Sequence, residues 1–300
     1  MKAVTRVTFL DDNGEKFFGE GPARLLRSVD EHGSLRSAAI AMEMAYTKAL
    51  KLVKQAETAL GYPLITRTTG GKDGGGSSLT PEGKQWLLQY EAYRDACVKS
   101  NQTLYRRFFP QIGCVIMASG LSKRFGSNKL MADFHGTPLI QRALDATAGL
   151  FARRVVVTRH ESVAGLCREQ NLDVVLHDLP HRSDTIRLGL EALSDLDACM
   201  FLPGDQPLLR RETVAMLLEN WKENPDRIVR PAYEDSEGSP VLFPAWAIPE
   251  LKNLPEGKGG GVVIQNHLHE ICRVSVTNPY ELADADTPET LELLKSLCRD

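Results

Sequence analysis

Cysteine pairs, long apolar runs and clustered metal ligands are all missing from this sequence. Its six cysteines, at positions 97, 114, 167, 199, 272 and 298, include no C-x-x-C pair, which argues against a disulfide framework or a zinc knuckle. Nowhere do 18 apolar residues occur in succession, and no early segment joins a basic start to a long apolar run. We therefore expect a cytoplasmic protein with reduced, mostly buried thiols and no membrane segment.

The histidines do not indicate a metal site either. His177 and His181 stand four apart and His267 and His269 two apart, whereas a metal site needs three or four convergent ligands. We interpret these side chains as solvent-facing or hydrogen-bonded.

The length and charge of the chain suggest two domains. Its 300 residues fit domains of roughly 100 and 200 residues, and 42% hydrophobic with 25% charged residues is typical of a globular protein. Residues 1–110 have a net charge of +4 and residues 111–300 a net charge of −7. We expect the domains to cover residues 1–109 and 110–300, with a mildly basic front that is compatible with nucleic acid.

Three short helices are predicted in the front domain. The first runs from about Pro22 to Glu31 and is ended by Gly33, and Ser34 can cap a second helix that continues to Met42. On a third, the apolar residues fall at spacings of three and four, the pattern of a buried helix face: Ala49, Leu52, Val53, Ala56 and Leu60.

The opposite face of that third helix has the donors that a recognition helix offers to DNA: Tyr46, Thr47, Lys48, Lys51, Lys54 and Gln55. A solvated amphipathic helix is the alternative. The next segment favours DNA binding, because residues 64–80 form two strand-like runs around a glycine-rich tip with Arg67 and Lys72, which reads as the wing of a winged helix. A flexible Gly/Ser linker is the alternative for the tip.

Residues 33–90, above all T-G-G-K-D-G-G-G-S-S-L-T-P-E-G, resemble the winged helix of ModE-type molybdate-responsive repressors. The resemblance implies a homodimer held largely through a long helix, here residues 81 to about 107. The apolar side of that helix carries Trp86, Leu87, Tyr90 and Tyr93. The family's C-terminal oxyanion-binding modules are absent and an unrelated domain follows, so we do not expect this chain to sense molybdate as those repressors do.

After Pro110 strands and helices alternate. We predict strands at 112–117, 154–158, 173–176 and 198–202, and helices at about 138–148 and 185–194. Apolar strands between helices favour an α/β fold with a mostly parallel sheet covered on both faces. Ligands of such sheets bind at the carboxyl ends of the strands.

Two loops at such strand ends carry the candidate chemistry. The first strand runs into V-I-M-A-S-G-L-S-K-R-F-G-S-N-K, where glycine N–H groups can approach phosphates and Arg124 and Lys129 can offset their charge. Another strand ends at P-G-D-Q-P, whose Asp205 suits Mg²⁺. A surface turn and a simple strand cap are the alternatives, but the order and separation favour an active site for nucleotidyl transfer.

Residues 112–298 resemble MobA-like nucleotidyltransferases, and more the molybdenum cofactor cytidylyltransferase branch than the guanylyltransferase branch. The motifs that carry this resemblance are M-A-S-G-L-S-K-R-F-G-S-N-K, S-D-T-I-R-L-G-L, P-G-D-Q-P-L-L, G-S-P-V-L-F and D-A-D-T-P-E-T-L. The implied fold is a Rossmann-like nucleotidyltransferase domain behind the winged helix-turn-helix.

The resemblance also implies roles for individual residues. The catalytic set is Arg124, Lys129 and Asp205, and Mg²⁺ is held by Asp205 and Asp286. The nucleotide is bound by Met117, Ala118, Ser119, Gly120, Ser122, Gly126, Lys129 and Gly204. The pterin side is bordered by Ser183, Arg187 and Lys258 in the Gly257–Gly260 loop. Ser119, His181, Thr185 and Ser239 depart from the family pattern.

Our leading hypothesis is transfer of CMP from CTP to Mo-molybdopterin. The G-D-Q-P motif favours cytidine, while Ser119 leaves the base open. The alternatives are guanylyl transfer to the same cofactor, cytidylyl transfer to a sugar or polyol phosphate, and a transcription regulator whose back domain only senses a nucleotide or cofactor. DNA, a second copy of the chain, and molybdoenzyme apoproteins or their chaperones are the expected partners.

Overall fold

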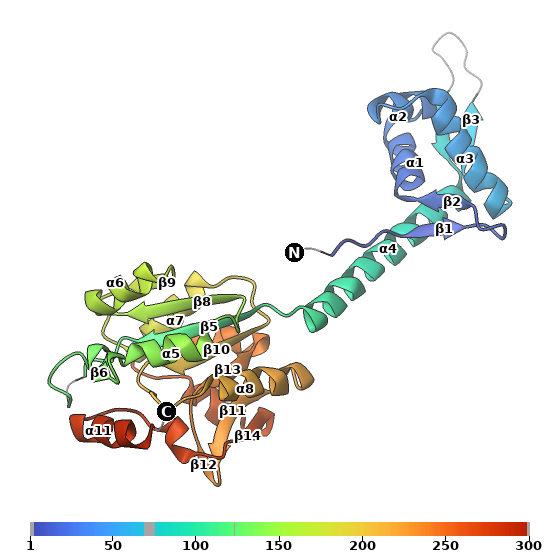
Figure 1. Ribbon diagram of the computed structural model, residues 1–300. Helices are drawn as coiled ribbons and strands as arrows, with labels where there is room; N and C mark the ends of the chain where they lie inside the picture. Colours follow the sequence, from blue (N-terminus) through green and yellow to red (C-terminus); the bar gives the residue numbers. More distant parts are fainter. Residues whose placement is uncertain (1–2, 69–75, 123, 299–300) are drawn as a thin grey trace. The chain divides into compact units, whose positions relative to one another are not determined.

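The structure is a computed structural model that describes residues 3–68, 76–122 and 124–298. The chain divides into two compact units, Met1–Tyr105 and Arg106–Asp300. The division falls within helix α4 (Pro81–Phe108), coloured teal in Figure 1.

The first unit contains the three predicted helices. They are α1 (Glu20–His32), α2 (Leu35–Ala41) and α3 (Tyr46–Leu60). Gly33 ends α1 with a left-handed φ of 64°, which glycine adopts without strain, and the Ser34 hydroxyl accepts a hydrogen bond from the Ser37 amide at 3.4 Å to cap α2. The sequence-predicted helix boundaries therefore agree with the structure to within about two residues.

The predicted wing is a two-stranded antiparallel hairpin. β3 (Ile65–Thr68) pairs with β4 (Gly76–Leu79), and Ile65 lies opposite Leu79. The tip at 69–75, which includes Lys72, lies outside the described residues. The Thr80 hydroxyl then accepts from the Gly83 amide at 2.8 Å, which starts α4.

An N-terminal hairpin, which the sequence reasoning did not predict, covers the start of α4. β1 (Thr8–Leu10) pairs with β2 (Lys16–Gly19), and Phe18 meets Tyr90 edge-on with ring centroids 5.1 Å apart. Leu87 and Tyr90 are buried in the core of their own unit. The apolar side expected to face a second copy is thus largely used within the protomer, although Tyr93 is 53% exposed.

The second unit is built around an eight-stranded sheet. The strands on the parallel side are β5 (Ile112–Ala118), β8 (Arg153–Thr158), β9 (Asp173–Leu176) and β10 (Ala198–Pro203). The others are β11 (Ile228–Tyr233), β12 (Ser236–Glu237), β13 (Val241–Pro244) and β14 (Ile271–Ser275), while β6 (Asp133–Phe134) and β7 (Thr137–Pro138) form a separate hairpin.

The sheet has the order β12-β11-β13-β10-β5-β8-β9, with β14 beside β11. The β10-β5-β8-β9 pairs and the β11-β14 pair are parallel, while β13 runs antiparallel to β10 and β11. The predicted mostly parallel sheet is confirmed.

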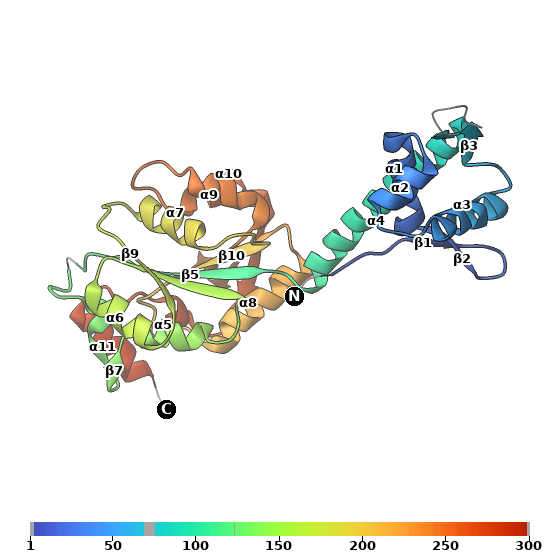
Figure 2. The ribbon, with the colours of Figure 1, turned by 90° about the horizontal axis from the view of Figure 1, so that it is seen from above.

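Helices cover both faces of this sheet (Figure 2). One face carries α7 (Arg182–Ala192), α9 (Ile248–Lys252) and α10 (Gly261–Asn266), and the other α5 (Ile140–Thr147), α6 (Glu161–Glu169) and α8 (Arg211–Glu223). The alternating residues of β5 explain this arrangement, because Cys114 and Ile116 join the core under α5 and α8 while Val115 joins the core under α7. α11 (Pro288–Leu297) packs with the β6–β7 hairpin. Across the described residues, we find no helix with the length and apolarity needed to cross a bilayer.

Candidate active site

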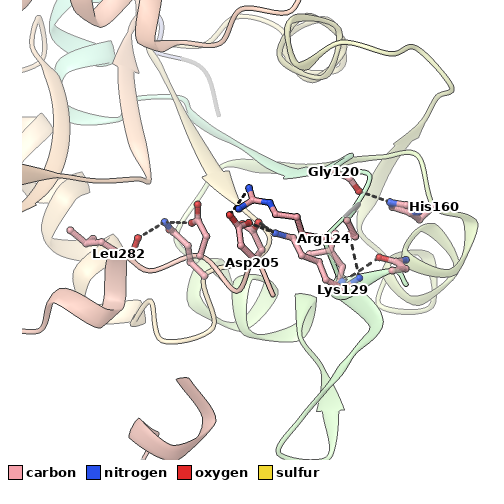
Figure 3. Close-up of polar contacts among 12 residues, drawn as sticks. Gly120, Arg124, Lys129, His160, Asp205 and Leu282 are labelled. Atoms are coloured by element: carbon pink, nitrogen blue, oxygen red, sulfur yellow. Dashed lines mark hydrogen bonds and ion pairs between the residues drawn. The ribbon is translucent and has the colours of Figure 1, made fainter. Parts of the chain in front are cut away.

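The loop after β5 folds back so that its end meets the end of β10. Ser122 and Gly126 both have positive φ values, 50° and 77°, and these bends reverse the chain. The Ser122 hydroxyl accepts a hydrogen bond from the Lys129 amide at 3.3 Å, and His160 contacts the Gly120 carbonyl oxygen through Nε2 at 2.9 Å. The loop therefore delivers Lys129 to the carboxyl edge of the sheet (Figure 3).

The Lys129 ammonium lies between two carboxylates. Its Nζ is 2.5 Å from Asp205 Oδ2 and 3.0 Å from Asp286 Oδ1, and Arg124 makes a second contact to Asp286 at 3.1 Å (Figure 3). Lys129 is buried, whereas the Arg124 side chain is exposed. The structure thus brings together the four charged residues that the sequence singled out for the triphosphate and its metal.

These contacts set the charges of the group. Burial alone would lower the pKa of Lys129, but the carboxylates of Asp205 and Asp286 outweigh it and the net shift is upward. The hydrogen bond from Lys129 in turn lowers the pKa of Asp286. Lys129 is therefore a permanent cation and Asp286 a permanent anion at neutral pH.

A third carboxylate, Asp284, belongs to this site and was not assigned from the sequence. Gln206 Nε2 donates to Asp284 Oδ1 at 3.0 Å and to the Leu282 carbonyl oxygen at 3.2 Å (Figure 3). The Ala285 amide donates to the Asp205 carbonyl oxygen at 2.8 Å, which ties the D-A-D segment to the end of β10. Burial, followed by the charge of Asp205, raises the pKa of Asp284. The repeated aspartates of D-A-D were the available signal for this residue.

A cavity of about 410 Å³ opens beside these groups. It is lined by Met117, Ser119 and Gly120 from the first loop and by Asp205 and Asp284. Of the other residues expected to contact a nucleotide, Ala118 is buried in the sheet, and its carbonyl oxygen accepts from the Thr158 hydroxyl at 2.9 Å. Gly204 is packed against Ile140, where an added Cβ would come within 2.6 Å of the Ile140 methyl group. These two positions shape the site without lining it.

Ser119 is held by His177, one of the histidines that we interpreted from the sequence as solvent-facing or hydrogen-bonded. Its hydroxyl donates to the Val157 carbonyl oxygen at 3.0 Å and lies 2.8 Å from His177 Nε2. Because the single hydroxyl hydrogen is used on Val157, we assign Nε2 as the donor in the second contact. Burial, aided by the charge of Arg159, lowers the pKa of His177, so the ring is neutral at pH 7.

The three residues expected on the pterin side do not share one cavity. Ser183 and Arg187 line a hollow of about 310 Å³, where Arg187 is ion-paired with Asp184 at 3.3 Å and Glu191 at 3.1 Å. Lys258 lines a different cavity of about 430 Å³. The Gly257 amide of the Lys258 loop nevertheless donates to the Ser183 hydroxyl at 3.3 Å, so the predicted residues lie on elements in contact while their side chains line two cavities.

The candidate DNA-binding residues of the first unit face solvent. On α3 these are Tyr46, Thr47, Lys48 and Lys51, and Arg67 is exposed on β3. The buried residues of α3 are Ala49, Val53 and Ala56, so the predicted division of this helix into a packed and a free face is confirmed.

The chain combines a domain of the NTP transferase type with a helix-turn-helix unit. Residues 114–271, more than half of the chain, match the family described as "MobA-like NTP transferase domain". The chain belongs to this family. Residues 23–84 match the bacterial regulatory helix-turn-helix proteins of the lysR family, which confirms the helix-turn-helix but points to a different group of regulators from the ModE resemblance.

Relatives with curated names cover part of the second unit. A "Probable molybdenum cofactor guanylyltransferase" of Aquifex aeolicus is 32% identical over 37% of this chain and 54% of its own length. A 3-deoxy-manno-octulosonate cytidylyltransferase of Neisseria meningitidis is 31% identical over 39% of this chain and 48% of its own. The chain thus spans about half the length of these relatives.

Solved structures share the fold of the second unit. Rv0371c of Mycobacterium tuberculosis superimposes with a TM-score of 0.56 and 23% identity over 62% of this chain and 98% of its own. A second structure of that protein, with manganese, gives a TM-score of 0.52 and 22% identity over 62% and 98%. At these identities the likeness concerns the fold alone.

Proposed function

We propose that this protein transfers CMP from CTP to the terminal phosphate of Mo-molybdopterin and releases pyrophosphate. The observation that carries the proposal is the buried Lys129 ammonium between Asp205 and Asp286, with Arg124 beside it, at the edge of the 410 Å³ cavity. Such a cluster of fixed charges suits a reaction in which negative charge moves between phosphates.

The reaction needs positioning more than proton transfer. An oxygen of the acceptor phosphate attacks the α-phosphorus of the nucleotide, and the bond from that phosphorus to the oxygen bridging to the β-phosphate breaks. Pyrophosphate leaves with the electron pair. Lys129 and Arg124 would offset the charge that builds on the leaving group, and the glycines of the first loop would let backbone N–H groups approach the phosphates.

The donor set fits Mg²⁺. Two carboxylates, Asp205 and Asp286, converge on one cationic point, the Lys129 ammonium. No group of three or more His, Cys, Asp or Glu side chains with metal-binding geometry occurs among the described residues. This is compatible with Mg²⁺, which commonly takes one or two protein carboxylates and completes its shell with substrate phosphates and water. When bound, the ion would polarise the phosphate oxygens, and manganese in Rv0371c supports a divalent site in this fold.

The relatives support the two halves of the proposed reaction separately. The Aquifex aeolicus protein carries molybdenum cofactor in its name, and the Neisseria meningitidis protein is a cytidylyltransferase. The first of these names favours GTP as a second candidate nucleotide. The helix-turn-helix match favours a third reading, a transcription regulator in which the second unit only senses its ligands.

We also propose DNA binding through α3 and the wing, and a homodimer. The exposed basic face of α3 supports DNA contact, and exposed Tyr93 and Leu104, which share one face of α4, support pairing of two copies. The proposed product would be delivered to molybdoenzyme apoproteins or their chaperones.

The deciding experiment is pyrophosphate release by the purified protein with Mg²⁺ and Mo-molybdopterin, comparing CTP, GTP, ATP and UTP. Release with CTP alone supports the proposal. Release with GTP alone moves the protein to guanylyl transfer, and no release from folded protein favours the sensing regulator. The Lys129→Ala variant controls for contaminating enzymes, because it should abolish any release due to this site.

A further inference from the structure

A second cavity adjoins the nucleotide cavity. It measures about 430 Å³ and shares four lining residues with the 410 Å³ cavity: Met117, Arg182, Pro203 and Ser239. It lies between the β10–β13 part of the sheet and helices α7, α9 and α10, which Figure 2 shows together on one face. A molecule in it would reach the nucleotide across the shared residues.

The floor of this second cavity is apolar. Phe201 of β10 and Phe243 of β13 meet edge-on with ring centroids 5.9 Å apart, and both line it. Gly260 lies directly against the Phe243 ring, where an added Cβ would come within 2.9 Å. The absence of a side chain at Gly260 therefore lets the backbone pack on the Phe243 ring, and the apolar floor suits the hydrophobic part of a ligand.

The polar side of the cavity is positively charged. Arg182, Arg230 and Lys258 line it, and its described lining contains no Asp or Glu. Arg230 is ion-paired with Glu237 at 2.6 Å. By contrast, Arg182 and Lys258 are exposed and form no ion pair with any residue that the structure describes. Two cations are thus left for an anionic ligand.

The backbone gives Arg182 a defined place. A Cβ at Gly259 would lie 3.2 Å from Arg182 Cδ and Nε, so the glycine leaves room for that side chain. Arg182 also opens α7, whose first turn adds the positive end of the helix dipole. Since Arg182 lines both cavities, it stands at the junction where an acceptor phosphate would meet the nucleotide.

We propose that the 430 Å³ cavity is the acceptor site and that it takes a ring-containing molecule with a phosphate monoester. The phosphate binds Arg182 at the junction, with Lys258 on the wall of the same cavity, and the ring system lies against the apolar floor to which Phe201 and Phe243 belong. This inference rests on the proposed function and identifies its acceptor site. We assign the acceptor to this cavity rather than to the hollow of Ser183 and Arg187, because Asp184 and Glu256 offset the positive charge of that hollow.

The test compares four variants: Arg182→Gln, Lys258→Gln, Arg187→Gln and, as a control in the neighbouring hollow, Lys252→Gln. We expect Arg182→Gln and Lys258→Gln each to raise the KM for Mo-molybdopterin at least tenfold. Lys258 does not line the nucleotide cavity, so Lys258→Gln should change the KM for CTP less than threefold. Arg182 lines both cavities, so Arg182→Gln should raise the KM for CTP as well, but less than the KM for Mo-molybdopterin. Lys252→Gln should change neither. A raised acceptor KM in Arg187→Gln but not in Arg182→Gln would overturn the assignment.

Direct binding separates this inference from the proposed reaction. Titration calorimetry with Mo-molybdopterin in the absence of nucleotide needs no turnover. If the wild type binds the pterin but releases no pyrophosphate, the proposed reaction fails while the site is still tested. A tenfold weaker affinity in Arg182→Gln then supports the acceptor site, and equal affinity, or no binding by the wild type, refutes it.

Discussion

Replacing Asp205 by asparagine removes one of the two carboxylates on Lys129 while keeping the size of the side chain. Loss of one preorganised charge at a phosphoryl-transfer site should lower turnover about 100- to 1,000-fold, which corresponds to about 2.7–4 kcal/mol of transition-state stabilisation. The measurement is pyrophosphate release at saturating CTP and Mg²⁺, with Mo-molybdopterin as the acceptor.

The cost in stability should be smaller than the cost in turnover. Leaving a buried charge without a partner destabilises a protein by about 3–5 kcal/mol, but Lys129 keeps Asp286 at 3.0 Å. Loss of the Asp205 charge also removes the repulsion between the Asp205 and Asp284 carboxylates, which helps to raise the pKa of Asp284. We therefore expect a loss of about 1–2 kcal/mol in urea unfolding.

A matched control is Asp173→Asn. Asp173 forms an exposed ion pair with Arg153 at 3.4 Å, so its loss should cost about 0–1 kcal/mol and leave turnover unchanged. Near-normal turnover in Asp205→Asn would refute the assigned site. The variant could also lose more than about 4 kcal/mol of stability while its turnover falls only by the fraction of unfolded protein. That result would mean that the charge cluster stabilises the fold and does not take part in the reaction.

Three further outcomes are expected. Gly189→Ala should destabilise the second unit by roughly 1–2 kcal/mol in urea unfolding, because the added Cβ would lie 2.6 Å from a Val115 methyl group. This overpacking outweighs the gain in helix propensity. The double variant with Val115→Ala should recover most of the lost stability. In His177→Asn the fall in stability below about pH 6.5 should be shallower than in the wild type. The lowered pKa of His177 makes the unfolded wild type bind more protons there, so the contribution of this residue to stability falls as the pH drops from about 6.5 toward its folded pKa; an unchanged slope in thermal unfolding contradicts this. Lys48→Ala should weaken DNA binding uniformly across sequences and reduce the salt slope by about one, as measured by fluorescence anisotropy at several salt concentrations, and a sequence-selective loss would instead indicate a base contact.

The parallel part of the sheet could be predicted because each strand is a short apolar run between helices. Strands 112–118 and 198–203 each end in a loop that carries candidate catalytic residues. Because the strands are parallel neighbours, these loops meet at one edge of the sheet, which brings Lys129 to Asp205. The antiparallel side was not predicted, since β11 contains Pro231 and pairs with β13 and β14, which lie farther along the chain. Pairings of this kind depend on register that short runs do not specify.

Helix α7 carries one residue of the proposed acceptor site, Arg182, that helical periodicity could have indicated but that the sequence analysis did not select. Residues three and four apart share a face, so Ser183 and Arg187 border one hollow while Arg182 and Ile186 line the cavity next to the nucleotide. Ile186 is only 2% exposed and packs against the sheet. An apolar residue four positions after Arg182 was therefore the signal that this arginine, rather than Arg187, lies on the inward face. The motif and the proposed acceptor site thus share helix α7, but the packed face of that helix decides which of its cations lines the cavity.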